Sequence, residues 1–133
     1  MKSTKYEVVF EPFSERHFIK TFAKKYKGAW DFTLSTIIQE FEKIDILFFK
    51  TIAEYITDKD ADVVICKTEF KISSTQESRH GSGNRCIVAI DKKTNKVHVL
   101  LIYYKSDLGG GNETAAWKKM IKDNYPQYKD LLS

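Results

Sequence analysis

Residues 79–105 constrain the fold of this chain most, because they form two apolar runs joined by a short polar turn. In the runs 86–90 and 97–104 nearly every side chain is β-branched, aromatic or aliphatic, and each run has the length of a strand rather than of a helix. The connector carries Asp91 and Asn95, which can bond their own backbone or adopt left-handed dihedral angles. The pattern predicts a β-hairpin. Because both faces of each run are largely apolar, we expect the hairpin in the interior of a sheet, covered on both sides.

Basic side chains gather at one end of this hairpin. The formal net charge of the chain, +4, does not by itself indicate a nucleic-acid partner, so the distribution of charge matters more. Residues 64–105 hold eight Lys or Arg against three acids. If the strands pair antiparallel, the residues that stand at the same end are Arg79, His80, Arg85 and Lys105. We therefore expect a cationic rim fixed on a rigid sheet.

The segments before the hairpin predict strands and amphipathic helices. Residues 5–10 are typical of a short strand, which ends at Pro12 because proline cannot continue a ladder. Ser14 is placed to cap a basic amphipathic helix over residues 14–25. Residues 31–56 carry apolar side chains at helical spacing and predict one helix or two.

A further strand, a loop and a final helix complete the pattern. Residues 63–72 are typical of a strand, and residues 73–84 of a polar loop. After the glycine run 109–111, Asn112 offers a helix N-cap, and Pro126 ends that helix. The order β-α-α-β-β-β with an extra C-terminal helix predicts a single α+β domain. In it the two long helical segments pack on one face of an antiparallel sheet.

Composition fits one domain of ordinary size. With 133 residues and 42% hydrophobic content, the chain is long enough to bury a core without staples. No run approaches the ~20 apolar residues of a membrane span, so we expect a soluble protein without a membrane partner. Cys66 and Cys86 fall in expected strands, and no leader of secretory type is present. These features favour buried free thiols over a disulfide and indicate a cytoplasmic protein.

Conventional catalytic motifs are absent from the sequence. It holds no paired-cysteine metal motif, no HExxH and no Walker loop, so we expect neither a metal nor a cofactor. His98 lies in an apolar strand and is expected to be hydrogen-bonded and structural, and His17 is expected on a helix surface. His80 differs, because it lies in a glycine-containing loop. The Gly-Ser-Gly segment of that loop can offer backbone N–H groups to a phosphate, but it does not connect a strand to a helix as nucleotide-binding loops do.

Two short motifs within this order of elements resemble a known family. They are SRHGSGNRCIV at residues 78–88 and LIYYK at residues 101–105. They are similar to the RelE/ParE toxin superfamily, particularly to HigB-like and RelE-like members of bacterial toxin–antitoxin systems. Those proteins carry a basic glycine-containing loop before an arginine-headed strand, then a hairpin, then an apolar strand that ends in an aromatic and a basic residue. The resemblance covers about residues 5–107 and implies a RelE-like compact fold.

The resemblance implies a toxin that cleaves mRNA in the ribosomal A site without a metal and is neutralised by a cognate antitoxin protein. In that reaction the ribose 2′-hydroxyl attacks the adjacent phosphate, and a fixed Lys or Arg holds the charge of the phosphorane. The resemblance assigns catalytic roles to Arg85, Lys105 and Tyr104, and His80 is expected to join them from the glycine-containing loop. Of these, Tyr104 is suited to stacking on a base. The residues assigned to RNA binding are Lys67, Lys71 and Arg79.

This sequence departs from the family pattern at two places. Ser106 and Asp107 replace further basic residues of RelE, and Asn84 stands where an aromatic residue commonly precedes the arginine. Two alternatives therefore stay open: a non-catalytic RNA-binding or interaction protein on the same fold, and a ParE-like toxin that inhibits gyrase. Arg85 can also serve only to pair with a carboxylate such as Asp107. Cations gathered around one concavity would favour cleavage, whereas cations dispersed over separate surfaces would favour generic binding.

Overall fold

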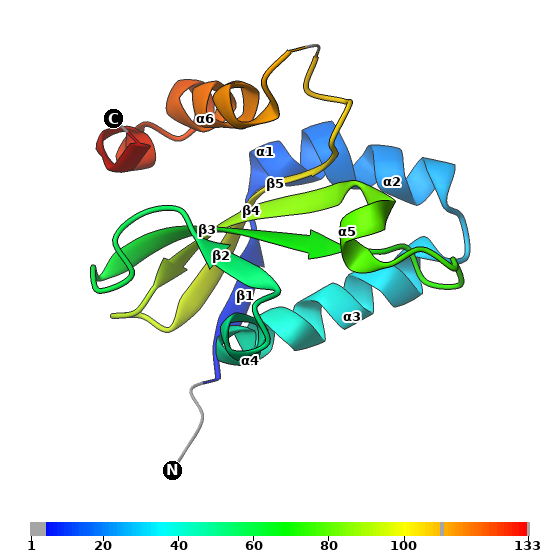
Figure 1. The fold of residues 1–133 in the computed structure, drawn as a ribbon, viewed down its shortest axis with the longest axis horizontal. Coiled ribbons are helices and arrows are strands. Elements are labelled where there is room, and N and C mark those ends of the chain that lie inside the picture. The colour runs from blue at the N-terminus through cyan, green and yellow to red at the C-terminus, as the bar shows by residue number, and fades with distance from the viewer. Residues whose placement is uncertain (1–4, 110, 133) are drawn as a thin grey trace.

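The computed structural model describes residues 5–109 and 111–132; residues 1–4, Gly110 of the expected glycine run and Ser133 lie outside it. The described chain contains a sheet of five strands in the order β1-β5-β4-β3-β2 (Figure 1). The strands are β1 (Glu7–Phe10), β2 (Ala53–Tyr55), β3 (Val63–Phe70), β4 (Asn84–Asp91) and β5 (Lys96–Tyr104). The predicted antiparallel pairing of β3 with β4 and of β4 with β5 is confirmed.

The first strand makes the sheet mixed rather than antiparallel. β1 pairs in parallel with β5, with Val8 opposite Val97 and Phe10 opposite Val99. The expectation of a wholly antiparallel sheet is therefore wrong at this edge. A parallel pair needs a crossover connection, and the helices and strands between β1 and β5 supply it.

The β4–β5 hairpin closes with the turn chemistry that the sequence predicts. The Oδ1 atom of Asp91 accepts hydrogen bonds from the N–H groups of Lys93 at 3.0 Å and Thr94 at 3.2 Å. Asn95 takes a left-handed conformation with a φ of 55°. These local bonds set the register in which Asp91 pairs with Lys96. A β-bulge between Ile87 and Val88 then shifts the pairing by one residue, so that Asn84 pairs with Tyr104 at the far end.

A continuous helical segment follows β1 and consists of α1 (Pro12–Ser14), the π-helical turn η1 (Glu15–Ile19) and α2 (Lys20–Lys25). Pro12 stands at the first helical position, where its missing N–H and fixed φ are tolerated. The prediction that Ser14 caps this helix is wrong. Ser14 lies inside the helix and is fully buried, and its hydroxyl has no hydrogen-bond partner among the residues that the structure describes.

The next segment contains two helices and then a strand. The helices are α3 (Trp30–Glu42) and α4 (Ile44–Phe49), and the non-helical backbone of Lys43 separates them. α4 ends because the N–H groups of Thr51 and Ile52 bond back to carbonyls of its last turn, at 3.0 and 2.8 Å. The prediction of helix as far as residue 56 is therefore wrong beyond α4. Residues 53–55 form β2, an edge strand paired antiparallel with β3.

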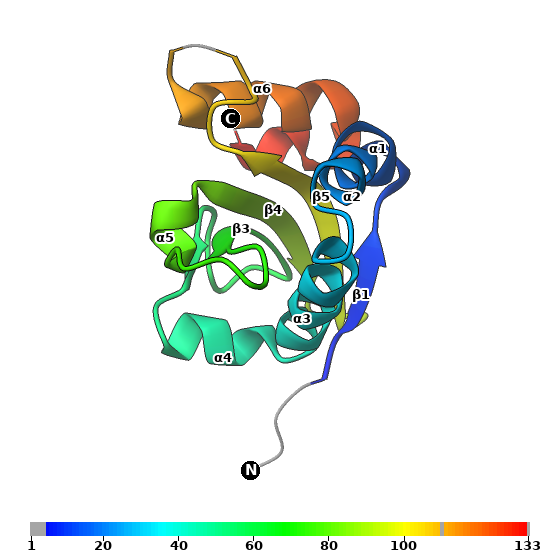
Figure 2. The same ribbon diagram turned by 90° about the vertical axis from the view of Figure 1, so that its right-hand side faces the viewer.

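Helices cover both faces of the sheet, with α6 on one side and α3 and α4 on the other (Figures 1 and 2). On the side of α2 and α3, Phe22, Ile37 and Phe41 are buried in a core with the sheet. This agrees with the prediction that the two long helical segments share one face. The opposite face is covered by α6 (Glu113–Asn124) and the 3-10 helix η2 (Pro126–Leu132), where Trp117 and Ile121 are fully buried.

A short helix interrupts the segment that the sequence predicts to be a loop. This helix, α5 (Arg79–Ser82), is capped by Ser78, whose Oγ accepts a hydrogen bond from the Gly81 N–H at 2.9 Å. The Ser82 hydroxyl donates to the Phe70 carbonyl at 2.6 Å and ties α5 to the end of β3. α5 therefore holds its side chains at a fixed place beside the first residues of β4.

The two cysteines are free and buried, as the sequence predicts. Burial raises the pKa of the Cys66 thiol to about 12 and also raises the pKa of Cys86, so neither thiol is ionised near neutral pH.

Within residues 5–109 and 111–132, none of the helices has the length and apolar character needed to cross a bilayer.

Replacing Gly83 with alanine should destabilise the fold more than replacing Gly28. Both glycines have left-handed backbones, with φ of 77° and 82°, so either alanine costs about 1–2 kcal/mol in strain. A Cβ at Gly83 would lie 2.7 Å from the Tyr104 Cε1 atom, whereas a Cβ at Gly28 meets nothing within 4 Å. Gly83→Ala should therefore lower the free energy of unfolding by ~1–3 kcal/mol more than Gly28→Ala, as measured by urea denaturation. Equal losses would contradict the Gly83–Tyr104 contact.

Candidate functional site

Polar side chains gather around a hollow of about 350 Å³ on the sheet face that α6 covers. The register sets Glu69 of β3 opposite Arg85 of β4, and Arg85 opposite Tyr103 of β5, so these three side chains share a face. We call this hollow the candidate site. The residues that line it are Thr51, Ile52, Glu54, Lys67, Glu69, His80, Arg85 and Glu113.

Arg85 is the most buried charge of the candidate site, with only 6% of the residue exposed. Its Nη1 atom lies 3.5 Å from the Glu69 Oε2 atom and donates hydrogen bonds to the Asn84 carbonyl at 3.2 Å and the His80 carbonyl at 3.5 Å. A buried guanidinium needs such partners, because an uncompensated charge would be strongly destabilising. The guanidinium is thereby fixed at the wall of the hollow.

Glu69 joins Arg85 to His80. Its two carboxylate oxygens lie 3.1 and 3.0 Å from the His80 Nδ1 atom. The two partners differ in exposure, since the His80 side chain is 86% exposed and that of Glu69 26%. The site therefore places an imidazole on the solvent side of a carboxylate and a guanidinium on its inner side.

Glu113 closes the other side of the hollow from the first turn of α6. Its Oε2 atom lies 3.2 Å from the Lys67 Nζ atom and accepts a hydrogen bond from the Tyr103 hydroxyl at 2.8 Å. Burial acts to raise the pKa of Glu113, but the hydrogen bonds from Tyr103 and Lys67 and the charge of Arg85 outweigh it and hold the pKa below its usual value. Burial, together with the hydrogen bond to Glu113, raises the pKa of Tyr103. Glu113 is thus a carboxylate and Tyr103 a neutral donor at neutral pH.

The candidate site is zwitterionic rather than cationic. Lys67 pairs with Glu113, and both His80 and Arg85 pair with Glu69. Of the expected cationic rim, His80 and Arg85 therefore pair with Glu69 of β3, and Arg79 pairs with Glu40 of α3. Among the described residues no group of three or more His, Cys, Asp or Glu side chains is arranged to hold a metal ion. The groups in place can transfer protons, through Glu69 and His80, and stabilise an anion, through Arg85 and Lys67.

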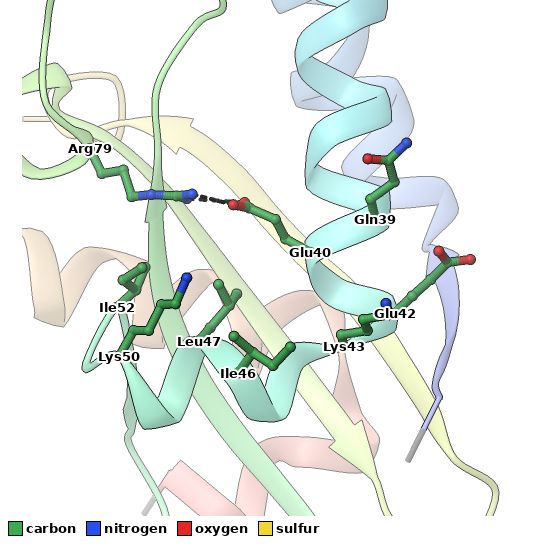
Figure 3. Close-up of a pocket in the computed structure, with 9 residues that line it drawn as sticks. All are labelled: Gln39, Glu40, Glu42, Lys43, Ile46, Leu47, Lys50, Ile52 and Arg79. Carbon is green, nitrogen blue, oxygen red and sulfur yellow. Dashed lines mark hydrogen bonds and ion pairs between the residues drawn. The ribbon is translucent and has the colours of Figure 1, made fainter. Parts of the chain in front are cut away.

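Lys71 lies away from this hollow, whereas Arg79 borders it without lining it and donates a hydrogen bond to the Glu69 carbonyl at 3.4 Å. Arg79 forms an ion pair with Glu40 of α3 and lines a different hollow of about 400 Å³, between α3 and α4 (Figure 3). Lys71 and Arg79 both line a third hollow of about 290 Å³, beside Thr33 of α3. The structure therefore divides the three expected RNA-binding residues, and only Lys67 belongs to the candidate site.

Tyr104 and Lys105 do not join Arg85 directly. Tyr104 is opposite Asn84, one position along from Arg85, so its side chain points to the other face of the sheet. Lys105 lines an adjoining hollow of about 340 Å³ at the start of α6, and Glu113 is common to both hollows. Of the four expected catalytic residues, the candidate site brings together Arg85 and His80.

Sequence reasoning missed Glu69, Glu113 and Tyr103. Only the strand register shows that Glu69 and Tyr103 flank Arg85, and Glu113 joins them from α6. Period-two alternation along β3, β4 and β5 is the signal that would have found Glu69 and Tyr103, once the register is known. His98 is hydrogen-bonded as predicted, with its Nδ1 atom 2.8 Å from the Glu11 Oε1 atom.

Comparison of the chain with protein-family models, with curated proteins and with solved structures gives no match in any of the three.

Replacing Glu113 with glutamine should remove part of the pH dependence of stability. The folded-state pKa of Glu113 lies below its ordinary value of 4.5, so the ionised group stabilises the fold above about pH 4.5, and this contribution is lost as the pH falls through the folded-state pKa. Glu113→Gln should lower the free energy of unfolding by about 1 kcal/mol at pH 7, and the difference from wild type should shrink in acid. Urea denaturation at several pH values measures this.

The control for that experiment is Glu54→Gln. Glu54 lines the same hollow, is exposed and forms no ion pair with any of the residues that the structure describes. Its replacement at pH 7 should change the free energy of unfolding by no more than ~0.5 kcal/mol. A Glu113→Gln difference that stays constant from neutral pH into acid would contradict the role given to its charge.

Thr51, at the mouth of the hollow, has a left-handed backbone with a φ of 58°. A β-branched residue is a genuine outlier there, whereas asparagine tolerates this conformation. We expect Thr51→Asn to raise the free energy of unfolding by about 0.5–1 kcal/mol. Thr57→Asn is not an equivalent change, because the Thr57 hydroxyl accepts a bond from the Ile65 N–H, and it should destabilise. Thermal unfolding measures the change. If Thr51→Asn is less stable than the wild type, the backbone of Thr51 is not strained.

Proposed function

We propose that this protein is a RelE-like toxin of a bacterial toxin–antitoxin system, acting in the cytoplasm as a metal-independent endoribonuclease on ribosome-bound mRNA. The observation that carries the proposal is the contact of Glu69 with both His80 and Arg85 in one hollow. Glu69 provides a proton acceptor, His80 a proton donor and Arg85 a fixed cation. Cleavage of RNA by its own 2′-hydroxyl needs these three roles and no cofactor.

The order of the elements also supports the resemblance on which this proposal rests. β1 is followed by helices, and then β3, β4 and β5 form an antiparallel unit. Arg85 stands near the head of β4, directly after the glycine-containing segment, and Lys105 follows β5. The extra helix α6 contributes Glu113 to the hollow, and so it is part of the site that we propose.

The reaction begins with the transfer of the 2′-hydroxyl proton to Glu69. The 2′-oxygen forms a bond to phosphorus while the bond from phosphorus to the 5′-oxygen breaks, which leaves a 2′,3′-cyclic phosphate and a 5′-hydroxyl. Protonated His80 gives a proton to the departing 5′-oxygen. The His80 Nδ1 atom faces the Glu69 Oε2 atom at 3.0 Å, so the donated proton comes from Nε2. Exchange with water then removes the proton from Glu69 and returns one to His80, which restores both groups.

Arg85 stabilises the additional charge of the phosphorane. In the free protein its guanidinium is shared with the Glu69 carboxylate at 3.5 Å. When Glu69 takes up the 2′-hydroxyl proton it loses its negative charge, so its attraction for Arg85 falls in the same step in which the phosphate becomes more negative. The ion pair therefore holds Arg85 in place before the reaction and releases its charge to the transition state. Lys67, at the inner edge of the hollow, suits a neighbouring phosphate.

The partners that follow from this proposal are mRNA on the ribosome and an antitoxin protein that covers the site. A non-catalytic RNA-binding or interaction protein is the alternative, and one observation favours it. Lys67, His80 and Arg85 each already have a carboxylate partner, and Arg79 and Lys71 line other surfaces. A ParE-like toxin directed at gyrase is the remaining alternative, and the experiment that follows separates it from the other two.

Arg85→Ala should reduce the rate of mRNA cleavage on ribosomes by roughly 10²–10³-fold, since it removes one preorganised donor. His80→Gln should reduce it by roughly 10²-fold or more, since it removes the proton donor. The assay measures cleaved mRNA, and growth arrest on expression is scored in parallel. Because the His80 side chain is 86% exposed, this second variant keeps its fold even if Arg85→Ala does not.

The matched control is Lys71→Ala, which removes an exposed cation that lines a different hollow. It should cleave at nearly the wild-type rate. Equal cleavage by wild type, Arg85→Ala and His80→Gln would overturn the catalytic assignment. No cleavage by the wild type, with growth arrest and inhibited gyrase, would support the ParE-like alternative, and RNA binding without arrest would support the non-catalytic one.

A further inference from the structure

The positive charge of this protein is concentrated on one helical segment that the candidate site does not use. The chain has 22 Lys and Arg against 18 Asp and Glu, an excess of four. Residues 15–27 contain five Lys or Arg and one acid, also an excess of four, so the rest of the chain holds seventeen of each. The five cations, which we call the basic helix surface, are Arg16, Lys20, Lys24, Lys25 and Lys27. They lie on η1, on α2 and just beyond α2.

The basic helix surface is exposed and lacks the carboxylate partners that neutralise the candidate site. The side chains of all five residues are exposed to solvent. Within the described part of the chain none of them forms an ion pair, and only Lys25 has an aromatic contact, 5.3 Å above the ring of Tyr26. A cluster of unpaired like charges repels itself, so it favours an anionic partner that can contact several of them at once.

The apolar side of the same helical segment is already used in the core. Phe22 is buried and stacks on Trp30 with ring centroids 4.9 Å apart, and Phe18 packs edge-on to Phe13 at 6.0 Å. A helix that lies in a membrane surface needs a free apolar face to insert among the lipids. This segment has none to offer, so its surface can act only through charge and hydrogen bonding.

The basic helix surface lies at a different place on the molecule from the candidate site. α2 follows β1, which forms one edge of the sheet, whereas the candidate site is built from β2, β3 and β4, toward the other edge. Figure 2 shows α1 and α2 beside β1 at the right of the view, whereas α5 lies at the left. A polyanion on the basic helix surface would therefore not occupy the hollow beside Arg85.

We propose that the basic helix surface binds the phosphate backbone of a double-stranded segment of RNA, as a contact separate from the candidate site. Cations on a rigid helix suit a duplex, because its phosphates are held at regular spacing and each contact releases a condensed counterion. Double-stranded RNA is recognised mainly by shape and by its backbone, which requires no reading of bases. The choice of RNA over DNA rests on the proposed function, but the presence of a polyanion contact does not.

The experiment compares two triple variants of equal net charge in binding a labelled RNA duplex at several salt concentrations. The test variant is Lys20→Gln, Lys24→Gln, Lys25→Gln, and the control variant is Lys50→Gln, Lys59→Gln, Lys93→Gln, whose residues are exposed and lie elsewhere. The slope of log binding constant against log salt should be smaller in magnitude by about 2–3 in the test variant, because three phosphate contacts are lost. The control variant should retain the wild-type slope.

Equal slopes in both triple variants would overturn the proposal, as would binding of the wild type to anionic phosphatidylserine vesicles in place of the RNA duplex. A duplex DNA of the same sequence that binds more tightly than the RNA would overturn the choice of RNA. Since the readout is binding without cleavage, loss of the proposed catalytic function would leave this result unchanged.

Discussion

The central strand β4 is buried on both faces along nearly its whole length, from Asn84 to Ile90, and the rest of the structure is arranged to make that burial possible. α2 and α3 supply apolar side chains for one face, and α6 and η2 supply them for the other. Because the strand is so little exposed, a polar group on it is costly unless it finds a partner within the protein. The apolar residues Cys86 to Ile90 meet that condition through the sheet ladder alone.

Arg85 is the residue at which this condition acts most strongly. A guanidinium so deeply buried beside an apolar strand is retained only with a carboxylate and carbonyl oxygens around it, and Glu69, Asn84 and His80 supply them. The requirement to neutralise Arg85 thus brings a carboxylate to the wall of the hollow, and the same carboxylate holds His80. The contacts that make the burial of Arg85 possible are therefore the same contacts that form the candidate site.

The sequence was a good guide where the chemistry is local. The hairpin could be recognised because β-branched and aromatic runs flank its turn. In that turn Asp91 accepts a hydrogen bond from a nearby backbone N–H, and Asn95 adopts a left-handed conformation, as these residue types commonly do. The helix from Asn112 and its end near Pro126 follow from cap and breaker residues in the same way. Local signals failed at Ser14, where Pro12 had already started the helix. They failed again at β2, whose three residues are too few to show alternation.

The candidate site was harder to predict because its partners come together across strands. Arg85 and His80 could be singled out from a basic, glycine-containing motif, but the motif contains no information about Glu69, which lies on another strand. A shift of one residue in the pairing would turn Glu69 to the opposite face. Likewise, Tyr103 and not Tyr104 shares the face of Arg85. A basic residue can be identified from the sequence around it, whereas the carboxylate that pairs with it is known only from the tertiary structure.

The parallel pairing of β1 with β5 has a consequence for how the chain acquires its fold. β3, β4 and β5 are consecutive and can pair through connections of at most 13 residues, but Glu7 must pair with Lys96, which is 89 residues away in the sequence. Contacts so distant in sequence pay the full entropy of closing a long loop and slow the folding of the domains that depend on them. During synthesis, the first strand to leave the ribosome is therefore the last to gain its neighbour.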